Sequence, residues 1–429
     1  MTNLIVNGGK KLSGRIQPSG NKNAILPMLC ATLLSDEKIT LSNVPNISDV
    51  DKILAFFAEI GSSIKADKQA KTIEIQHNGH YHSSQMTQLP TGIRSAVLLI
   101  APTLFRFKSL IFDTDSKGCA LGVREIDPHL EILELFGCHI SSTSPYTFEL
   151  NKSLTGQKIW LDYASVTTTE AFLMLAAISA GRSTIINAAC EPHVQEFCHF
   201  LVAMGAKITG IGSSTLVIQG VEKLVGCHYK VPDVLHEVAT FLMIGGATGG
   251  KILVETDITE HMTLIIRQLQ KLGMNVTEQE HGILVDGSSK QIKQTYTTEL
   301  MTKVEASPWP YFPADLLPQL IGSSISCKGE ILFWNKVYEG ALSWVGELSK
   351  FGAKVHLSDP HRLVVIGSDD LRPATVEAPY IIRVVLGLFI AALQIDGESV
   401  IKHADPIKRA HPDFVEKLKA IGADVEWVD

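Results

Sequence analysis

Leu201-Val202-Ala203-Met204-Gly205 is the phrase that decides how this chain folds, because five similar phrases occur along it. In each, an apolar helical stripe ends at a glycine and a short alternating segment follows. Glycine just after a helix adopts the left-handed conformation that ends the helix at little cost. The six glycines are 68 to 79 residues apart, too regular a series for chance. The other five phrases are Phe57–Gly61, Leu133–Gly137, Leu269–Gly273, Leu348–Gly352 and Leu418–Gly422.

The segments around these phrases predict one α/β unit built six times. After the glycine, Lys207–Gly210 turns into Thr215–Ile218 with the period-two pattern of a strand that buries one face. Before each unit lies a helix that is apolar all round, for example Thr169–Ile178 or Ile382–Leu393. We expect these apolar helices inside, with the strands and the amphipathic helices around them.

The length of 429 residues favours two domains of roughly 200 residues each, so each domain takes three repeats. A glycine-bounded link at Gly220–Cys227 marks the midpoint. We predict a first domain at 22–228 and a second formed by 1–21 plus 229–429, with the strand Leu4–Val6 completing a sheet of the second. The cleft between two such domains is the expected ligand site.

Composition limits the kinds of partner. Hydrophobic residues make up 45% of the chain, charged residues 19%, and the net charge is -7, which speaks against binding to nucleic acid. The seven cysteines form no CxxC pair, which suits a reducing cytosol and gives no support to a zinc site. No signal peptide is recognisable, and apolar runs such as Val384–Leu393 are about half as long as a membrane span. We expect a cytoplasmic protein with no membrane partner.

The run Ser116–Asp127 is the first candidate for chemistry. Gly118 and Gly122 predict a mobile loop. Cys119 lies between the cations Lys117 and Arg124, a setting that activates a thiol. The alternative is a buried, inert cysteine at the end of a strand.

Lys22 precedes an apolar helix expected at Ile25–Leu34. A helix N-terminus with a lysine in front of it can bind an anion, although an ordinary surface lysine would look the same. Pro308–Asp315 is a stiff run of prolines and aromatic residues that ends in a carboxylate. Asp315 is either the N-cap of the helix through Leu320 or a general base in a dry, rigid setting.

Two arginines stand in otherwise apolar helices, Arg94 and Arg383, and a third, Arg409, lies near a helix start. A buried guanidinium is costly unless it is paired, so a structural salt bridge is the alternative to function. Together with Lys22 and Arg124, Arg383 and Arg409 can hold a phosphate and a carboxylate.

Taken together, these stretches resemble the enolpyruvyl transferases from Leu4 to Val428, and most of all the branch that acts on UDP-N-acetylglucosamine at the start of peptidoglycan synthesis. The most specific pieces are Lys22-Asn23, the loop Gly118-Cys119…Gly122-x-Arg124-x-x-Asp127, and Phe312-Pro313-x-Asp315. The resemblance implies a two-domain inside-out α/β barrel with three repeats in each half.

The resemblance also implies transfer of the enolpyruvyl group of phosphoenolpyruvate to the sugar 3-hydroxyl, by addition and then elimination of phosphate, with no metal or organic cofactor. Cys119 would protonate the methylene carbon and react with the epoxide antibiotic fosfomycin, and Asp315 would take the hydroxyl proton. Phosphoenolpyruvate would be bound by Lys22, Asn23, Arg124, Arg383 and Arg409. The nucleotide sugar would be bound by Arg94, Arg124, Asp127, Tyr163, Ser165, Val166, Asp315 and Val337.

Departures from the family pattern gather on the acceptor side. Tyr163 stands where the family has a lysine, Ala341 and Cys190 each stand where it has an arginine, and Ala314 precedes the expected base where threonine is usual. Lys117 and Glu125 alter the cysteine loop. Two alternatives therefore stay open: a transferase for another nucleotide or sugar alcohol, and a silent protein that binds a nucleotide sugar and regulates a partner.

Overall fold

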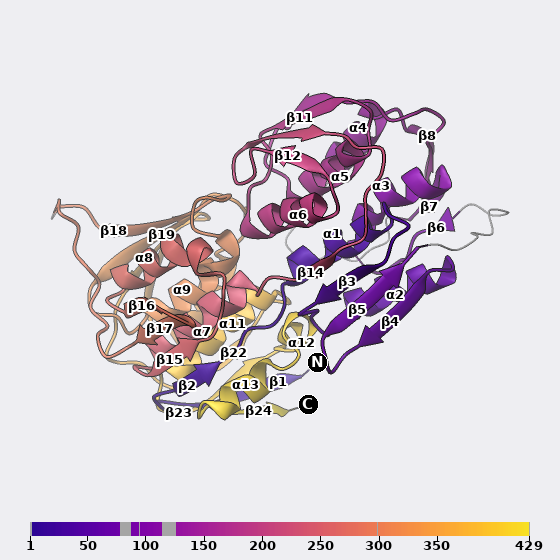
Figure 1. The fold of residues 1–429 in the computed structure, drawn as a ribbon. Helices are drawn as coiled ribbons and strands as arrows, with labels where there is room; N and C mark the ends of the chain where they lie inside the picture. The colour runs from indigo at the N-terminus through magenta and orange to yellow at the C-terminus, as the bar shows by residue number, and fades with distance from the viewer. Residues whose placement is uncertain (1, 78–86, 94, 114–125, 298, 429) are drawn as a thin grey trace. The chain divides into compact units, whose positions relative to one another are not determined.

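The computed structural model describes residues 2–77, 87–93, 95–113, 126–297 and 299–428. They form two compact units (Figure 1). Unit 1 contains residues 2–19 and 233–428, and unit 2 contains the described residues from 20 to 232. Each unit has its own hydrophobic core.

The repeated phrase ends a helix in all six places, as predicted. The six glycines have φ between 83 and 99°, which is the left-handed region. After the outer helix Pro192–Ala203 (α6), the Gly205 N–H donates to Val202 O at 2.8 Å and the Ala206 N–H to Leu201 O at 2.9 Å. These two bonds satisfy carbonyls that the end of the helix leaves open. The other outer helices are α2 Ser48–Glu59, α4 Asp127–Leu135, α8 Thr263–Lys271, α10 Gly346–Lys350 and α13 Phe414–Ala420.

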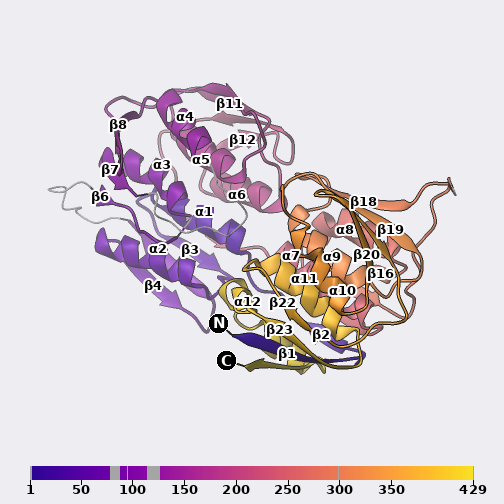
Figure 2. The same cartoon turned by 180° about the vertical axis from the view of Figure 1, so that it is seen from behind.

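The apolar helices lie inside each unit, which confirms the second part of the repeat prediction. Every residue of α11 (Ile382–Leu393) from Val384 to Leu393 is buried. In unit 1, α11 packs against α7 and α9, and the three lie side by side with strands around them (Figure 2). The other inner helices are α7 Leu235–Ala247 and α9 Leu317–Ser324 in unit 1, and α1 Lys22–Thr32, α3 Ala96–Phe107 and α5 Val166–Ala177 in unit 2. Short helices complete the set: η1 Thr259–Met262, η2 Ala314–Leu316, η3 Ser343–Val345 and α12 Pro406–Ala410.

The strands of the described residues form six four-stranded sheets, three in each unit. Each sheet has one parallel pair at one edge and antiparallel neighbours after it. In unit 2 the strand orders are β14 (His228–Lys230), β3 (Ile39–Ser42), β5 (Thr72–Gln76), β4 (Ser63–Asp67); β6 (Thr87–Gln88), β7 (Ser109–Phe112), β9 (Tyr146–Glu149), β8 (His139–Thr143); and β10 (Lys158–Trp160), β11 (Arg182–Ile186), β13 (Thr215–Gln219), β12 (Lys207–Thr209).

Unit 1 repeats this design with strands from both ends of the chain. The orders are β16 (Asn275–Gln279), β17 (Gly282–Asp286), β15 (Lys251–Val254), β2 (Ser13–Ile16); β18 (Thr302–Ala306), β19 (Glu330–Asn335), β21 (Arg362–Ile366), β20 (Lys354–Asp359); and β22 (Thr375–Glu377), β23 (Gly397–Lys402), β1 (Asn3–Gly8), β24 (Asp424–Val428).

The N-terminal strand β1 lies inside the last of these sheets. Leu4 is opposite Ile401 of β23 on one side and opposite Trp427 of β24 on the other. The side chains of Leu4 and Val6 are fully buried. The sixth repeat therefore borrows its central strand from the beginning of the chain.

None of the helices that the structure describes has both the length and the apolar character needed to cross a membrane.

Candidate active site

Asp315 and Arg383 form the centre of the candidate site in unit 1. Asp315 lies in η2, Arg383 is the second residue of α11, and Arg383 Nη1 donates a hydrogen bond to Asp315 Oδ1. The side chain of Arg383 is 15% exposed and that of Asp315 is 44% exposed. Neither η2 nor α9 has a side-chain cap, so the alternative in which Asp315 caps the helix is wrong. The salt bridge foreseen for Arg383 is confirmed, and its partner is the other candidate residue.

Tyr338 belongs to the same cluster, although the sequence did not single it out. Its hydroxyl donates to Asp315 Oδ1 at 3.4 Å, and the Arg383 guanidinium lies 4.6 Å from the centre of its ring. The segment that follows β19 and contains Tyr338 is held by Asn335 Oδ1, which accepts hydrogen bonds from the N–H groups of Val337 at 2.9 Å and Tyr338 at 3.1 Å. Val337, a predicted nucleotide-sugar residue, is 38% exposed beside it.

His236, in the first turn of α7, adds a neutral group to the cluster. Burial lowers the pKa of His236, the nearby carboxylate of Asp315 raises it, and the positive Arg383 and His411 lower it. The net shift is downward, so the imidazole is uncharged at neutral pH. Asp315 therefore has its cationic partner in Arg383 rather than in a protonated histidine.

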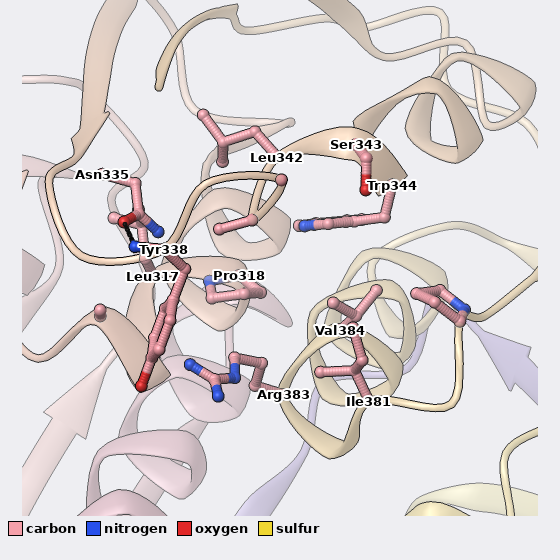
Figure 3. Close-up of a pocket in the computed structure, with 14 residues that line it drawn as sticks. Leu317, Pro318, Asn335, Tyr338, Leu342, Ser343, Trp344, Ile381, Arg383 and Val384 are labelled. Carbon is pink, nitrogen blue, oxygen red and sulfur yellow. Dashed lines mark hydrogen bonds between the residues drawn. The ribbon is translucent and has the colours of Figure 1, made fainter. Parts of the chain in front are cut away.

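A small pocket opens beside Arg383, with a volume of about 20 Å³. In Figure 3, Arg383 and Tyr338 lie at its lower side and Leu342 and Trp344 at its upper side. The nitrogen-bearing edge of the Trp344 indole points toward the middle of the group. Ala341, which stands where the family pattern has an arginine, is also part of the lining.

Glu237, the residue after His236, contacts three other segments of unit 1. Its carboxylate accepts from the Ser19 N–H, lies 3.4 Å from Lys417 Nζ and lies 3.6 Å from His411 Nδ1. Burial raises the pKa of Glu237, but the hydrogen bond and charge of His411, then Lys417 and the Ser19 N–H, outweigh burial and lower it to about 2. His411 directly follows α12, the helix that contains Arg409.

In unit 2, Lys22 is the first residue of α1, whereas the predicted helix began only at Ile25. The helix starts earlier because the Asn21 side chain caps it by accepting from the Asn23 N–H at 2.9 Å. Lys22 Nζ lies 2.9 Å from Asp49 Oδ2, and both side chains are largely buried. Asp49 is a residue that the sequence reasoning missed, since nothing local links it to Lys22.

Two predicted acceptor residues of unit 2 line one pocket. Asp127, the first residue of α4, and the half-exposed Tyr163 border a cavity of about 220 Å³. Its other lining residues are Pro128, Glu131, Leu161 and Asp162. Three carboxylates therefore face this cavity, and its lining within the described residues includes no lysine or arginine.

Ser165 and Val166 lie at the start of α5, next to this pocket in sequence. Ser165 takes the N-cap position, its hydroxyl lies 2.7 Å from Thr168 Oγ1, and its carbonyl accepts from the Thr169 N–H. The buried His129 of α4 lies 2.9 Å from Thr167 Oγ1. Burial lowers the pKa of His129 to about 4, although the Ile126 carbonyl, as an acceptor, opposes this shift. A neutral imidazole therefore joins α4 to the first turn of α5.

Arg94, Cys119 and Arg124 lie outside the described residues, as does the side chain of Arg409. Of the remaining candidates, the structure brings Asp315 into contact with Arg383 and places Asp127 and Tyr163 around one cavity. Within the part of the chain that is described, no three histidine, cysteine or acidic side chains are grouped to hold a metal ion.

Comparison with known families gives a match to EPSP synthase (3-phosphoshikimate 1-carboxyvinyltransferase) over residues 6–418. Among individual proteins, the chain is 34% identical to UDP-N-acetylglucosamine 1-carboxyvinyltransferase of Borreliella burgdorferi, over 100% of this chain and 99% of the relative. It is also 34% identical to the protein of that name from Bradyrhizobium diazoefficiens, over 99% of this chain and 97% of the relative.

Solved structures agree on the fold. The enolpyruvyl transferase NikO from Streptomyces tendae superposes with a TM-score of 0.85 at 20% identity, over 100% of this chain and 99% of the other. EPSP synthase from Acinetobacter baumannii gives a TM-score of 0.80 at 18% identity over both whole chains. The two-domain enolpyruvyl transferase fold that the resemblance implied is therefore confirmed, and this chain belongs to the EPSP synthase family of enolpyruvyl (carboxyvinyl) transferases.

Proposed function

We propose that this enzyme transfers the enolpyruvyl group of phosphoenolpyruvate to the 3-hydroxyl of UDP-N-acetylglucosamine and releases phosphate. The observation that carries the proposal is the Asp315–Arg383 pair with Tyr338 beside it, because it supplies a carboxylate and a fixed cation at the positions that the resemblance assigns to the base and the donor site. The identity of about a third with named UDP-N-acetylglucosamine 1-carboxyvinyltransferases over the whole chain supports the choice of acceptor.

In the proposed addition step, the Cys119 thiol gives its proton to the methylene carbon of phosphoenolpyruvate. The acceptor oxygen then bonds to C2 as positive charge develops there, and Asp315 takes the hydroxyl proton. Fixed carboxylate and phosphate partners stabilise that charge. Arg383 balances the negative charge of Asp315 in the free enzyme.

In the proposed elimination step, the thiolate left at Cys119 takes a proton back from the methyl carbon at C3, and the C2–C3 double bond forms again. The bond from C2 to the phosphate oxygen breaks, and the departing phosphate takes the proton held by Asp315. Phosphate leaves and the enol ether remains on the sugar. Lys22, Asn23, Arg124, Arg383 and Arg409 hold the donor in this proposal. The Lys22 ammonium would leave Asp49 to bind the phosphate, or it would contact Asp49 and the phosphate at the same time.

The nucleotide sugar would occupy the surface around Asp127, Tyr163, Ser165 and Val166, with Arg94, Arg124 and Val337 as further contacts. One observation favours a different acceptor: the cavity beside Tyr163 is lined by Asp127, Glu131 and Asp162, and carboxylates repel a diphosphate. Another nucleotide or a sugar alcohol is therefore the second candidate. A silent nucleotide-sugar-binding regulator is the third.

Measuring phosphate release distinguishes the three candidate functions. The protein is incubated with phosphoenolpyruvate and UDP-N-acetylglucosamine, and then with other nucleotides and sugar alcohols. Release with the first acceptor supports the main proposal, and release only with another alcohol supports the second candidate. Binding of a nucleotide sugar with no release from any acceptor would leave the regulator.

Asp315→Asn tests the base directly. Asparagine keeps the size of the side chain but cannot take the hydroxyl proton, so we expect kcat to fall by at least about a hundredfold. Asp370→Asn is the matched control, because the Asp370 side chain is 88% exposed in the same unit. Equal activity of the two variants would remove Asp315 from the mechanism.

Fosfomycin should label Cys119 selectively. Burial raises the pKa of Cys138 to about 11 and those of Cys198 and Cys327 to about 12, so these cysteines present little thiolate at neutral pH. Peptide mass spectrometry after exposure to the epoxide measures the site of modification. An unmodified Cys119 peptide after prolonged exposure would argue against an accessible, activated thiol.

A further inference from the structure

Trp344 carries a buried polar group for which the described residues provide no partner. Its side chain is 4% exposed, and its indole Nε1 has no hydrogen-bond acceptor among those residues. The indole N–H is a donor only. A buried donor without an acceptor disfavours the folded state, so it needs an explanation such as a ligand.

The position of this donor suggests what the ligand is. Trp344 lines the pocket of about 20 Å³ that Arg383 also lines, and the nitrogen edge of its ring points inward (Figure 3). A cavity of this size holds about one oxygen-sized group. The ligand group is therefore small, and at least one of its atoms accepts a hydrogen bond.

The charge of the lining points to an anionic group. The lining residues include the Arg383 guanidinium but neither aspartate nor glutamate. Leu317, Pro318 and Leu342 form apolar walls, which strengthen any hydrogen bond made inside. Arg383 is held in place by Asp315 and by the ring of Tyr338, so its orientation is fixed before a ligand arrives.

We propose that this pocket receives the carboxylate of the three-carbon enolpyruvyl donor, with the Trp344 indole N–H as a second donor beside Arg383. A carboxylate suits it better than a phosphate, because a flat group can insert one oxygen where a tetrahedral group is too wide. Nε1 lies beneath the surface in the free protein, so the lining must shift slightly as the oxygen enters. Trp344 then determines donor specificity; this inference rests on the proposed function.

Trp344→Phe removes the N–H and keeps an aromatic ring. We expect the KM for phosphoenolpyruvate to rise about tenfold, since hydrogen bonds to charged groups are worth at least a factor of that size. The acceptor KM should stay within about twofold of wild type, and the melting temperature of the free enzyme should not fall. Trp427→Phe is the control, because it removes an indole N–H from β24, and Trp427 is not among the residues that line the pocket. If the variant does not fold, benzothienylalanine at position 344, which replaces only the N–H by sulfur, serves instead.

Indole NMR gives a readout that a merely structural role would not move. The chain has five tryptophans, and the signal lost in the position-344 variant assigns Trp344. Phosphoenolpyruvate should move that signal downfield, and inorganic phosphate alone should not. Movement with phosphate alone would overturn the carboxylate assignment.

The two readouts keep this inference and the proposed function distinguishable. An unmoved Trp344 signal in an enzyme that releases phosphate would end the inference and leave the function standing. A signal that moves with phosphoenolpyruvate in a protein that transfers nothing would support the pocket and end the function. If phosphoenolpyruvate neither moves the signal nor supports transfer, both fail together.

Discussion

Each unit buries a glutamate on an inner helix, and the pKa values of the two glutamates are shifted in opposite directions. Glu237 on α7 of unit 1 and Glu170 on α5 of unit 2 are each 1% exposed. Glu237 has the Ser19 N–H, Lys417 and His411 around it, and its pKa is lowered to about 2. Burial, and then the charge of Glu191, raise the pKa of Glu170 well above its usual value. Equal burial therefore accompanies a lowered carboxyl pKa in one unit and a raised carboxyl pKa in the other.

Hydrogen bonding explains the difference. An ionised carboxylate survives burial only if donors and cations replace its water. Glu237 has these replacements, whereas Glu170 Oε1 has no hydrogen-bond partner within the described part of the chain. Both units repeat the same backbone design. The side chains around each buried glutamate determine whether its ionised form is favoured.

The largest expected effect is that of Glu237→Gln. It removes the buried anion that Lys417 and His411 share, and we expect the free energy of unfolding to fall by about 3 kcal/mol. Urea unfolding at pH 7 measures the loss. Glu170→Gln is the matched control, because the raised pKa of Glu170 favours its neutral acid form, and glutamine is also neutral. A similar loss in both variants would break the comparison.

The effect of Glu237 should disappear in acid. Its folded pKa of about 2 lies below its ordinary value of 4.5, so its stabilisation is present above pH 4.5 and is lost as the pH falls toward 2. The difference between wild type and Glu237→Gln should shrink from about 3 kcal/mol at pH 7 to about 1 kcal/mol at pH 2.5. A difference that stays constant over this range would show that folding does not lower the pKa of Glu237.

Glu170 should show the opposite dependence on pH. Its folded pKa is raised, so the stability due to its protonated form is present below pH 4.5 and is lost as the pH rises through the folded pKa. Glu170→Gln should therefore gain stability relative to wild type with increasing pH, by at most about 1.4 kcal/mol per pH unit for one proton. Urea midpoints at pH 5, 6 and 7 follow this trend, and parallel curves for the two proteins would refute it.

The smallest effect should be equal in both units. Gly205 in unit 2 and Gly422 in unit 1 both have φ of +99°, and an added Cβ would touch nothing closer than 3.9 Å at either position. Alanine at either site should cost only the left-handed penalty of about 1 kcal/mol. Thermal unfolding of the two variants gives the comparison. Unequal losses would mean that the repeats differ in backbone as well as in side chains.

The sequence was sufficient to predict the repeats, since both of their signals are local. A glycine after a helical stripe and a helix that is apolar all round are each visible within about a dozen residues. The helix at Ile382–Leu393 was predicted with the bounds that the structure gives it. The start of α1 was missed because its cap, Asn21, lies just before the apolar run.

The partners of the site residues were beyond the sequence. Asp315 and Arg383 are 68 positions apart, and Lys22 and Asp49 are 27 apart, so no periodicity connects them. Tyr338 and His236 stand in unremarkable contexts and become part of the cluster only when β19, η2, α7 and α11 come together. The types of side chain needed for the chemistry were predictable, whereas which cation would pair with which anion depends on tertiary packing.

The central place of β1 in the last sheet has a consequence for synthesis of the chain. Its neighbours β23 and β24 are some 400 positions later, and a ribosome at about 5–20 residues per second needs at least about 20 seconds to reach them. Throughout that time the backbone N–H and C=O groups of β1 lack the strands with which they pair in the folded protein. Unit 2, whose strands all come from one continuous segment, can finish folding while the nascent chain is still growing, but unit 1 has to wait for the final residues to emerge.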